Sequence, residues 1–205
     1  CIARLFRVIL GGLMTSFSNV MVSGKGRRYR ANWESRPVDP STVLAAFSDA
    51  VAAAIGEIDT FADRPVREAT VLCGDSRVVF ETLDSVDLIV CSPPYPNSFD
   101  YTDVYNLELW MLGYLGSAQE NRTLRQSTLT SHVQVSRDFA TAPSTPMLNR
   151  TMTALYRCAS QLWDRRLPAM VGGYFADLLT LLQASARLLP QGGQAWFVVG
   201  DSQYA

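Results

Sequence analysis

A four-residue segment, Ser92-Pro93-Pro94-Tyr95, combines a hydroxyl group, two ring-locked backbone positions and an aromatic ring. Each proline fixes φ and removes a backbone N–H donor, so the turn is stiff and its carbonyl groups remain as acceptors. Such a turn suits a planar ring that carries an exocyclic amine, because the oxygens accept its N–H bonds while Tyr95 stacks on its face. The alternative is a rigid turn that ends a buried strand.

The Ser92 turn is one of three polar segments that follow apolar runs; the others are Gly74-Asp75-Ser76 and Gly200-Asp201-Ser202. In open α/β sheets the ligand lies outside the carboxyl ends of the strands. We therefore expect chemistry at these three places. For Asp75, a role as the N-cap of a following helix is as good an interpretation as a functional role. For Asp201, a strand-end turn or a cap is favoured over a functional role.

The elements that position these segments follow from the apolar pattern. Residues 86–91 form a continuous apolar, β-branched run, which predicts a central strand buried on both faces. Further strands are predicted at 69–73 and 195–199. Helices are predicted at 1–14, 41–58, 101–115 and 170–189, a loop at 19–37, and a long polar loop or inserted subregion at 116–150. Alternating helices and strands predict an α/β fold with a mostly parallel sheet.

Composition narrows the class of protein. The chain has 205 residues, 48% of them hydrophobic and 18% charged, which is typical of one globular domain. A formal net charge of −1 excludes a global basic field. No apolar run reaches about 18 residues, so the sequence excludes a membrane span and no membrane partner is expected. One histidine and four cysteines without CxxC spacing argue against a metal site and favour a reducing cytoplasm.

Residues 87–95, Asp-Leu-Ile-Val-Cys-Ser-Pro-Pro-Tyr, resemble the catalytic motif of the amino-methylating DNA methyltransferases. These enzymes transfer a methyl group from S-adenosylmethionine to N4 of cytosine or N6 of adenine. Their motif is Asp, Asn or Ser, then Pro-Pro, then Tyr or Phe, and the Ser form is more often associated with N4-cytosine. The stretches 96–110 and 188–201 extend the resemblance, which covers about residues 70–115 and 175–205.

The resemblance implies a Rossmann-like class I methyltransferase fold with a mostly parallel sheet, which we expect to be incomplete here. It implies that the target base is flipped out of double-stranded DNA. Ser92 and the Pro93 carbonyl would accept bonds from its amine, beside Pro94, and Tyr95 would stack on the base. Asp75 matches the position that meets the cofactor adenine, with Ser76 next to it. Catalysis would rest on positioning and electrostatics.

Two groups of basic residues are candidates for holding DNA phosphates. The first group lies beside Tyr29 and Trp33, and the second lies in the polar segment 116–150, which is itself a candidate for base recognition. The groups are Lys25, Arg27, Arg28 and Arg30, and Arg122 and Arg125. Solvated surface loops are the alternative for both. His132, in the same polar segment, is predicted to be a surface residue.

The family's cofactor loop, Phe-x-Gly-x-Gly after the first strand, has no counterpart in this sequence. We therefore expect the chain to be a piece of a longer protein, with a missing segment or a restriction system as a partner. The competing function is a truncated or degenerate methyltransferase-like module that binds DNA or a partner without transferring methyl groups. A third is methylation of an amine on protein or RNA.

Overall fold

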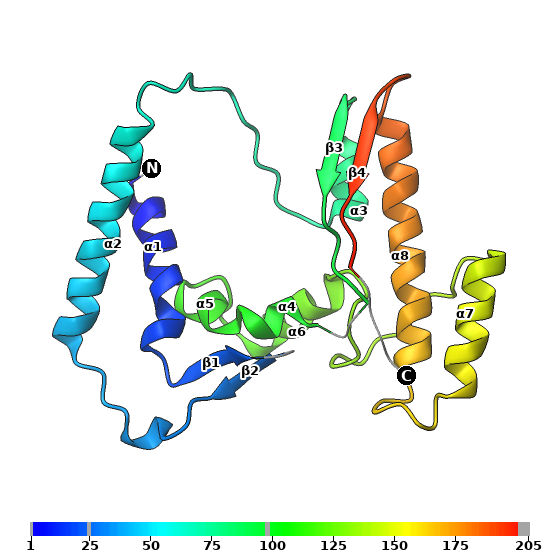
Figure 1. Ribbon diagram of the computed structural model, residues 1–205, viewed down its shortest axis with the longest axis horizontal. Coiled ribbons are helices and arrows are strands. Elements are labelled where there is room, and N and C mark those ends of the chain that lie inside the picture. Colours follow the sequence, from blue (N-terminus) through cyan, green and yellow to red (C-terminus); the bar gives the residue numbers. More distant parts are fainter. Residues whose placement is uncertain (1, 24–25, 97–98, 201–205) are drawn as a thin grey trace. The chain divides into compact units, whose positions relative to one another are not determined.

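The computed structural model describes residues 2–23, 26–96 and 99–200 (Figure 1). Lys25 and Asp201, two residues singled out from the sequence, lie outside the described residues. The chain forms two compact units, one made of residues 1–70 and 101–120 and the other of residues 71–100 and 121–205. Both contain helices and short strands, so the protein is mixed α/β with small sheets.

The first unit is built on two packed helices, α1 (Ile2–Phe17) and α2 (Pro40–Thr60). The rings of Phe6 and Phe47 meet edge to face at 5.8 Å between centroids. Asp39 caps α2 by accepting a hydrogen bond from the Ser41 backbone N–H, and Pro40 occupies the first turn, where it forfeits no helical bond. This confirms the helix predicted from residue 41.

A hairpin occupies part of the predicted loop at 19–37. Strands β1 (Val20–Ser23) and β2 (Gly26–Tyr29) pair antiparallel. Arg27 donates to Asn106 Oδ1 at 3.1 Å and lies 3.8 Å from Asp103, while Arg30 donates to backbone carbonyl groups before the hairpin. The prediction of a loop was wrong because these arginine contacts, and not an alternating apolar pattern, fix the strands.

The polar segment and its neighbours are more helical than the sequence predicts. The helix expected at 101–115 divides into α4 (Tyr101–Val104) and α5 (Asn106–Met111). Far from this region, a short 3₁₀ turn forms at Trp33–Ser35, inside the predicted loop at 19–37. The expected loop at 116–150 contains α6 (Ala118–Ser127) and the start of α7 (Pro146–Arg157). Helix α6 has no buried residue, so the sequence lacks the apolar stripe that would have revealed it.

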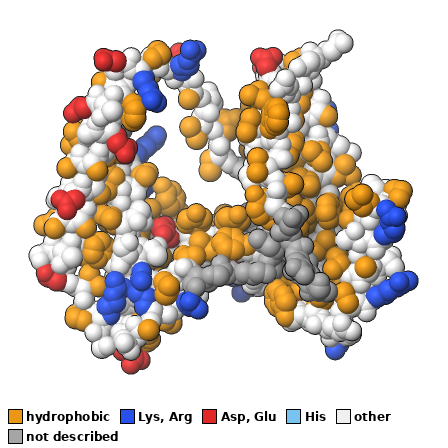
Figure 2. All heavy atoms as spheres, viewed as in Figure 1, with side chains coloured by type: hydrophobic (Ala, Val, Ile, Leu, Met, Phe, Trp, Pro, Cys, Tyr) orange, Lys and Arg blue, Asp and Glu red, His pale blue; other side chains and the backbone are white. Residues whose placement is uncertain are grey.

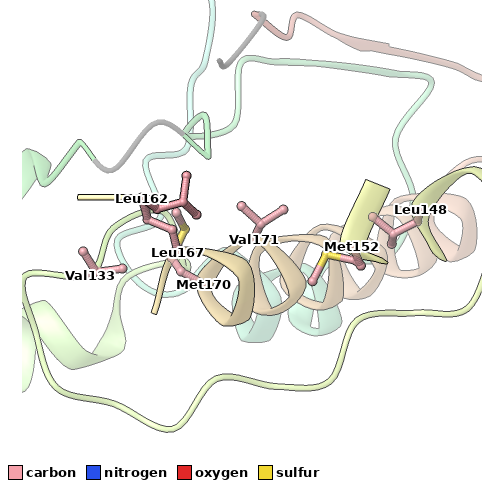
Figure 3. Close-up of a cluster of buried hydrophobic side chains, with 7 residues drawn as sticks. All are labelled: Val133, Leu148, Met152, Leu162, Leu167, Met170 and Val171. Atoms are coloured by element: carbon pink, nitrogen blue, oxygen red, sulfur yellow. The ribbon is translucent and has the colours of Figure 1, made fainter. Parts of the chain in front are cut away.

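The second unit holds the remaining elements: α3 (Ser76–Val79), a 3₁₀ turn at Phe80–Thr82, β3 (Leu88–Cys91), α8 (Leu167–Leu188) and β4 (Gln194–Phe197). Its core surrounds the first half of α8, where Leu167 and Met170 are fully buried near Val133 and Leu162 (Figure 3). Gly173 lets Thr130 approach this helix closely, since a Cβ on Gly173 would lie 3.1 Å from Thr130 Cγ2.

Strands β3 and β4 run parallel, with Leu88 opposite Gln194 and Cys91 opposite Phe197. The predicted parallel pairing is confirmed, but the strand at 69–73 is not formed, and Val71 is 91% exposed. β3 is also not buried on both faces, because Ile89 is buried whereas Val90 is 66% exposed. Within the described residues only β4 pairs with β3, and the exposure of Leu88 and Val90 shows that the second face of β3 is open there.

Two helices, α2 and α8, are long and apolar enough to cross a membrane by length and composition alone. Half of the most apolar stretch of α8 is buried inside its unit, as in the core helix of a soluble protein, whereas none of that of α2 is buried. The sequence-based exclusion counted only uninterrupted apolar residues, which is a stricter criterion than mean hydropathy. Length and composition do not by themselves separate a membrane helix from a core helix.

Candidate functional site

Ser92 directly follows β3 and sits at the carboxyl end of the parallel pair. The ladder continues past both strands, with Val198 N–H donating to the Cys91 carbonyl at 2.9 Å. The Ser92 hydroxyl then donates to the Val198 carbonyl at 3.1 Å and lies 3.0 Å from the Tyr95 hydroxyl. Because a hydroxyl has one proton, a Ser92 proton given to Val198 leaves its oxygen to accept the bond from Tyr95 and one more.

The turn is anchored on one side and open on the other. Pro93 is buried and Ser92 is exposed, so the fixed prolines present the hydroxyl to solvent. The Tyr95 ring rests on the backbone after β4, since a Cβ on Gly200 would lie 3.1 Å from its Cε2 atom. Burial, with Tyr95 nearby, raises the pKa of Tyr174 above its usual value. Tyr95 thus lies against the segment that follows β4.

Asp75 caps α3, which is the alternative weighed from the sequence. Its carboxylate accepts from the Arg77 backbone N–H at 2.9 Å and from the Arg77 guanidinium at 2.6 Å (Nη2) and 3.0 Å (Nε). These bonds from Arg77 lower the pKa of Asp75 below its usual value although partial burial opposes the shift. The predicted contact of Asp75 and Ser76 with a cofactor stays a prediction, and a cofactor would share Asp75 with Arg77.

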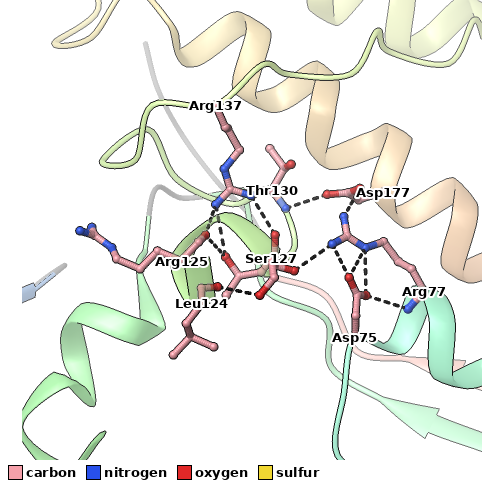
Figure 4. Close-up of polar contacts among 9 residues, drawn as sticks. Asp75, Arg77, Leu124, Arg125, Ser127, Thr130, Arg137 and Asp177 are labelled. Atoms are coloured by element: carbon pink, nitrogen blue, oxygen red, sulfur yellow. Dashed lines mark hydrogen bonds and ion pairs between the residues drawn. The ribbon is translucent and has the colours of Figure 1, made fainter. Parts of the chain in front are cut away.

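Arg77 also links α3 to α6 and α8, which sequence reasoning missed (Figure 4). Its guanidinium donates to Asp177 Oδ1 at 2.6 Å and to the Ser127 carbonyl at 2.9 Å. The second Asp177 oxygen accepts from the Thr130 backbone N–H at 2.8 Å. The signal was weak, because Asp177 is one aspartate in an apolar helix and its partners are 47 and 100 residues away.

A second set of charges holds the segment after α6. Asp100, 1% exposed, accepts from Arg125 Nε at 3.0 Å and Nη2 at 2.5 Å. Arg137 donates to the Arg125 and Thr128 carbonyls at 2.7 and 2.8 Å. These bonds tie the residues that follow the Ser92 turn to α6. Arg125 as a DNA contact stays a prediction, and a phosphate would compete there with a buried carboxylate.

His132 is 2% exposed, so the prediction that it is a surface residue was wrong. Its Nε2 lies 3.7 Å from Asp100 and 3.5 Å from Arg137 Nη2. Burial lowers the pKa of His132 below 6.5; Asp100 opposes this shift, and Arg137 and Arg125 add to it. The imidazole is therefore held neutral, and the segment that carries it packs inside the unit.

The lowered pKa of His132 predicts sensitivity to mild acid. Between the folded-state pKa and 6.5 the unfolded chain binds more protons, so the free energy of unfolding rises with pH in this window, and this contribution is lost as the pH falls through it. We expect chemical denaturation to show a loss of stability between pH 7 and pH 5 that His132→Gln reduces. Equal pH slopes in the two proteins would show that His132 is not the responsible group.

The remaining arginines that were predicted to bind phosphates differ in their surroundings. Arg27 and Arg30 are engaged with the protein itself, as described for the hairpin. Arg28 and Arg122 are exposed, and neither forms an ion pair within the part of the chain that the structure describes. Tyr29 and Trp33 stack on one another at 4.7 Å between ring centroids. DNA contacts by these residues stay predictions.

The structure joins Ser92 with Tyr95 and Asp75 with Arg77, all within the second unit. Among the described residues, no hydrogen bond or ion pair links these two pairs to each other. The Ser92 turn is therefore the part of the candidate site with a defined chemical geometry: an oriented hydroxyl, a fixed backbone and an adjacent aromatic ring.

Comparison with known proteins finds similarity to type II methyltransferases. Type II methyltransferase M.AvaI of Nostoc sp. (strain PCC 7120 / SAG 25.82 / UTEX 2576), and the protein of that name from Anabaena variabilis, are each 27% identical to the chain over 133 residues. Type II methyltransferase M.BsoBI of Geobacillus stearothermophilus is 26% identical over 145 residues. The chain is a distant relative of type II methyltransferases.

The matched region is 60% of this chain but only 27% to 28% of the relatives, so the chain spans about a quarter of the length of the curated relatives it matches. No family model matches the sequence. No solved structure matches it either.

Proposed function

We propose that the chain is part of the catalytic region of a DNA amino-methyltransferase. It would act on the exocyclic amine of a flipped base, with N4 of cytosine favoured over N6 of adenine, and would belong to the Rossmann-like class I methyltransferases. Double-stranded DNA is its proposed partner, the cytoplasm its proposed location and restriction–modification its proposed context. The resemblance of residues 87–95 and the relationship to type II methyltransferases support this proposal.

The single observation that carries the proposal is the orientation of the Ser92 hydroxyl. With its proton donated to the Val198 carbonyl, the oxygen can accept an N–H bond from the target amine, and the Pro93 carbonyl can accept the other. Both bonds draw the nitrogen lone pair out of conjugation with the base and direct it toward the incoming methyl group. Nothing in this arrangement requires a covalent intermediate.

S-adenosylmethionine, the proposed methyl donor, fits the described residues only in part. The Asp75 carboxylate is engaged by three bonds from Arg77, and the sequence has no Phe-x-Gly-x-Gly loop. These residues therefore do not form a complete pocket for the cofactor. We propose that a further segment of the natural protein supplies the remaining contacts.

The alternative function is a methyltransferase-like module that binds DNA or a partner without transferring methyl groups. The observation that favours it is the same saturation of Asp75 by Arg77, which gives this carboxylate a structural role without any cofactor. The two functions share a DNA partner and differ in catalysis.

The deciding experiment is a methylation assay with the protein encoded by the complete gene. We expect transfer of radioactive methyl groups from S-adenosylmethionine to duplex DNA, and N4-methylcytosine after digestion to nucleosides and mass spectrometry. Detection of N6-methyladenine would support a DNA amino-methyltransferase but would show that its target base is adenine. Duplex binding without transfer, together with no heat of binding when S-adenosylmethionine is titrated, would replace the enzyme by the binding module.

A further inference from the structure

A groove of about 700 Å³ lies within the second unit, between α7, the start of α8 and residues 139–142. Its floor is apolar, with Ala142, Met152 and Gly172, and its wall on α7 carries polar side chains. These are Asn149, Thr153, Tyr156 and Arg157. No carboxylate lines the groove within the described residues. The combination of a flat apolar floor and a polar, cationic wall suits an anionic partner.

Helix α7 separates an apolar face from a basic one. Thr145 caps it and Pro146 opens it, and Leu148 and Met152 are buried in the core. Arg150 and Arg157 are seven residues apart, so they share the opposite, exposed face. Seven residues of helix span about 10 Å, or about three phosphate steps along one DNA strand. Figure 2 shows basic side chains over α7.

The charge balance of this surface differs from that of the whole chain. From Pro146 to Leu167 there are four arginines and one acidic residue, Asp164. Arg166 donates to Asp164 at 2.7 Å and neutralises it. That leaves Arg150, Arg157 and Arg165 without an acidic partner in the part of the chain described here. In a chain of net charge −1, this local excess is a feature of the surface and not of the composition.

Two exposed aromatic side chains lie among these arginines. Tyr156 is 58% exposed at the edge of the groove, and Trp163 is 61% exposed in the turn before α8. Exposed aromatic rings interleaved with arginines are typical of nucleic-acid-binding surfaces, where guanidinium groups bind phosphates and rings pack on sugars or bases. An acidic protein could form ion pairs with these arginines, but it has no sugars or bases on which the rings could pack.

We propose that this surface, made of α7, the turn to α8 and the groove beside them, binds the phosphate backbone of DNA. The proposal rests on the proposed function, because it names where the DNA of that reaction is held. Arg150, Arg157 and Arg165 would be the phosphate contacts, with Tyr156 and Trp163 packing beside them. None of these residues belongs to the basic groups that the sequence pattern singled out.

The test replaces Arg150, Arg157 and Arg165 together by glutamine, which keeps helix propensity while it removes the charges. The matched control is Arg187→Gln, which removes an exposed arginine of α8 that only approaches Glu81, at 3.6 Å. Binding of a labelled duplex to the 205-residue chain is followed by fluorescence anisotropy from 50 to 300 mM salt. Unchanged thermal midpoints show that the variants are folded.

We expect the slope of log K against log salt to fall in magnitude by about 0.9 for each lost phosphate contact, hence by two to three for the triple variant. Arg187→Gln should keep the parent slope. A triple variant with the parent slope and affinity would overturn the proposed surface and leave the proposed function standing. Poly-glutamate that competes as well as DNA would also overturn it, in favour of an acidic protein. A parent chain with no affinity for DNA would overturn the proposed surface, and the methylation assay on the protein encoded by the complete gene would still decide the proposed function.

Discussion

Asp177→Ala should lower the free energy of unfolding by about 2–3 kcal/mol, because it strands two donors at once. Arg77 would lose its 2.6 Å bond to Asp177 Oδ1, and the Thr130 backbone N–H would lose Asp177 Oδ2 as its acceptor. The effect stays below that of a fully buried pair, since Arg77 keeps Asp75 and the Ser127 carbonyl. Denaturant unfolding followed by circular dichroism measures the change.

The control for this prediction is Asp164→Ala, which removes an aspartate of similar burial whose arginine partner is more exposed. Asp164 accepts from the arginine two residues later, at 2.7 Å, and Arg166 is 51% exposed where Arg77 is 23% exposed. Exposed pairs contribute about 0.2–1 kcal/mol, so this variant should be nearly as stable as the parent. If the two variants lose the same stability, the Arg77 bonds do not hold α3, α6 and α8 together.

Parts of the fold could be predicted because their signals are local. The helix from residue 41 has its cap, its proline and its apolar face within one stretch, and β3 lies in the short apolar run 86–91 while β4 overlaps the run 195–199. Asp75 was correctly recognised as a potential cap, because Asp before a short helix accepts from the next turn. The Ser92 turn was found for the same reason: its chemistry is contained in four consecutive residues.

The remainder could not be predicted because it depends on partners far along the chain. His132 is buried because Asp100, 32 residues earlier, and Arg137 surround it, and no periodicity in its own segment announces this. Residues 69–73 have the composition of a strand, yet a strand needs a neighbour to bond with, and in the described residues none lies beside them. The sequence likewise does not show that Arg125 pairs with the buried carboxylate of Asp100, which lies 25 residues earlier.

Ser92→Ala should reduce the rate of methyl transfer by the protein encoded by the complete gene by about 100-fold, the scale expected when one preorganised group at a reacting centre is removed. The substitution removes the oxygen that bonds the Val198 carbonyl and the Tyr95 hydroxyl, so the target amine loses an acceptor. Single-turnover measurements with saturating duplex isolate the chemical step, and the KM for DNA should change little. Loss of transfer with an unchanged KM places Ser92 at the reacting amine.

The conservative variant Ser92→Asn separates catalysis from folding. The resembling family uses Asp, Asn or Ser at this position, and an amide oxygen can still accept a bond from the amine, so most of the lost rate should return. Tyr95→Phe, in contrast, keeps the ring on Gly200 but removes the 3.0 Å contact with Ser92. It should lower the rate less than Ser92→Ala does, because the Ser92 oxygen remains held by Val198. An active Ser92→Ala protein, or a Ser92→Asn protein as slow as Ser92→Ala, would mean that the hydroxyl only fixes the turn and that the acceptor for the amine lies elsewhere.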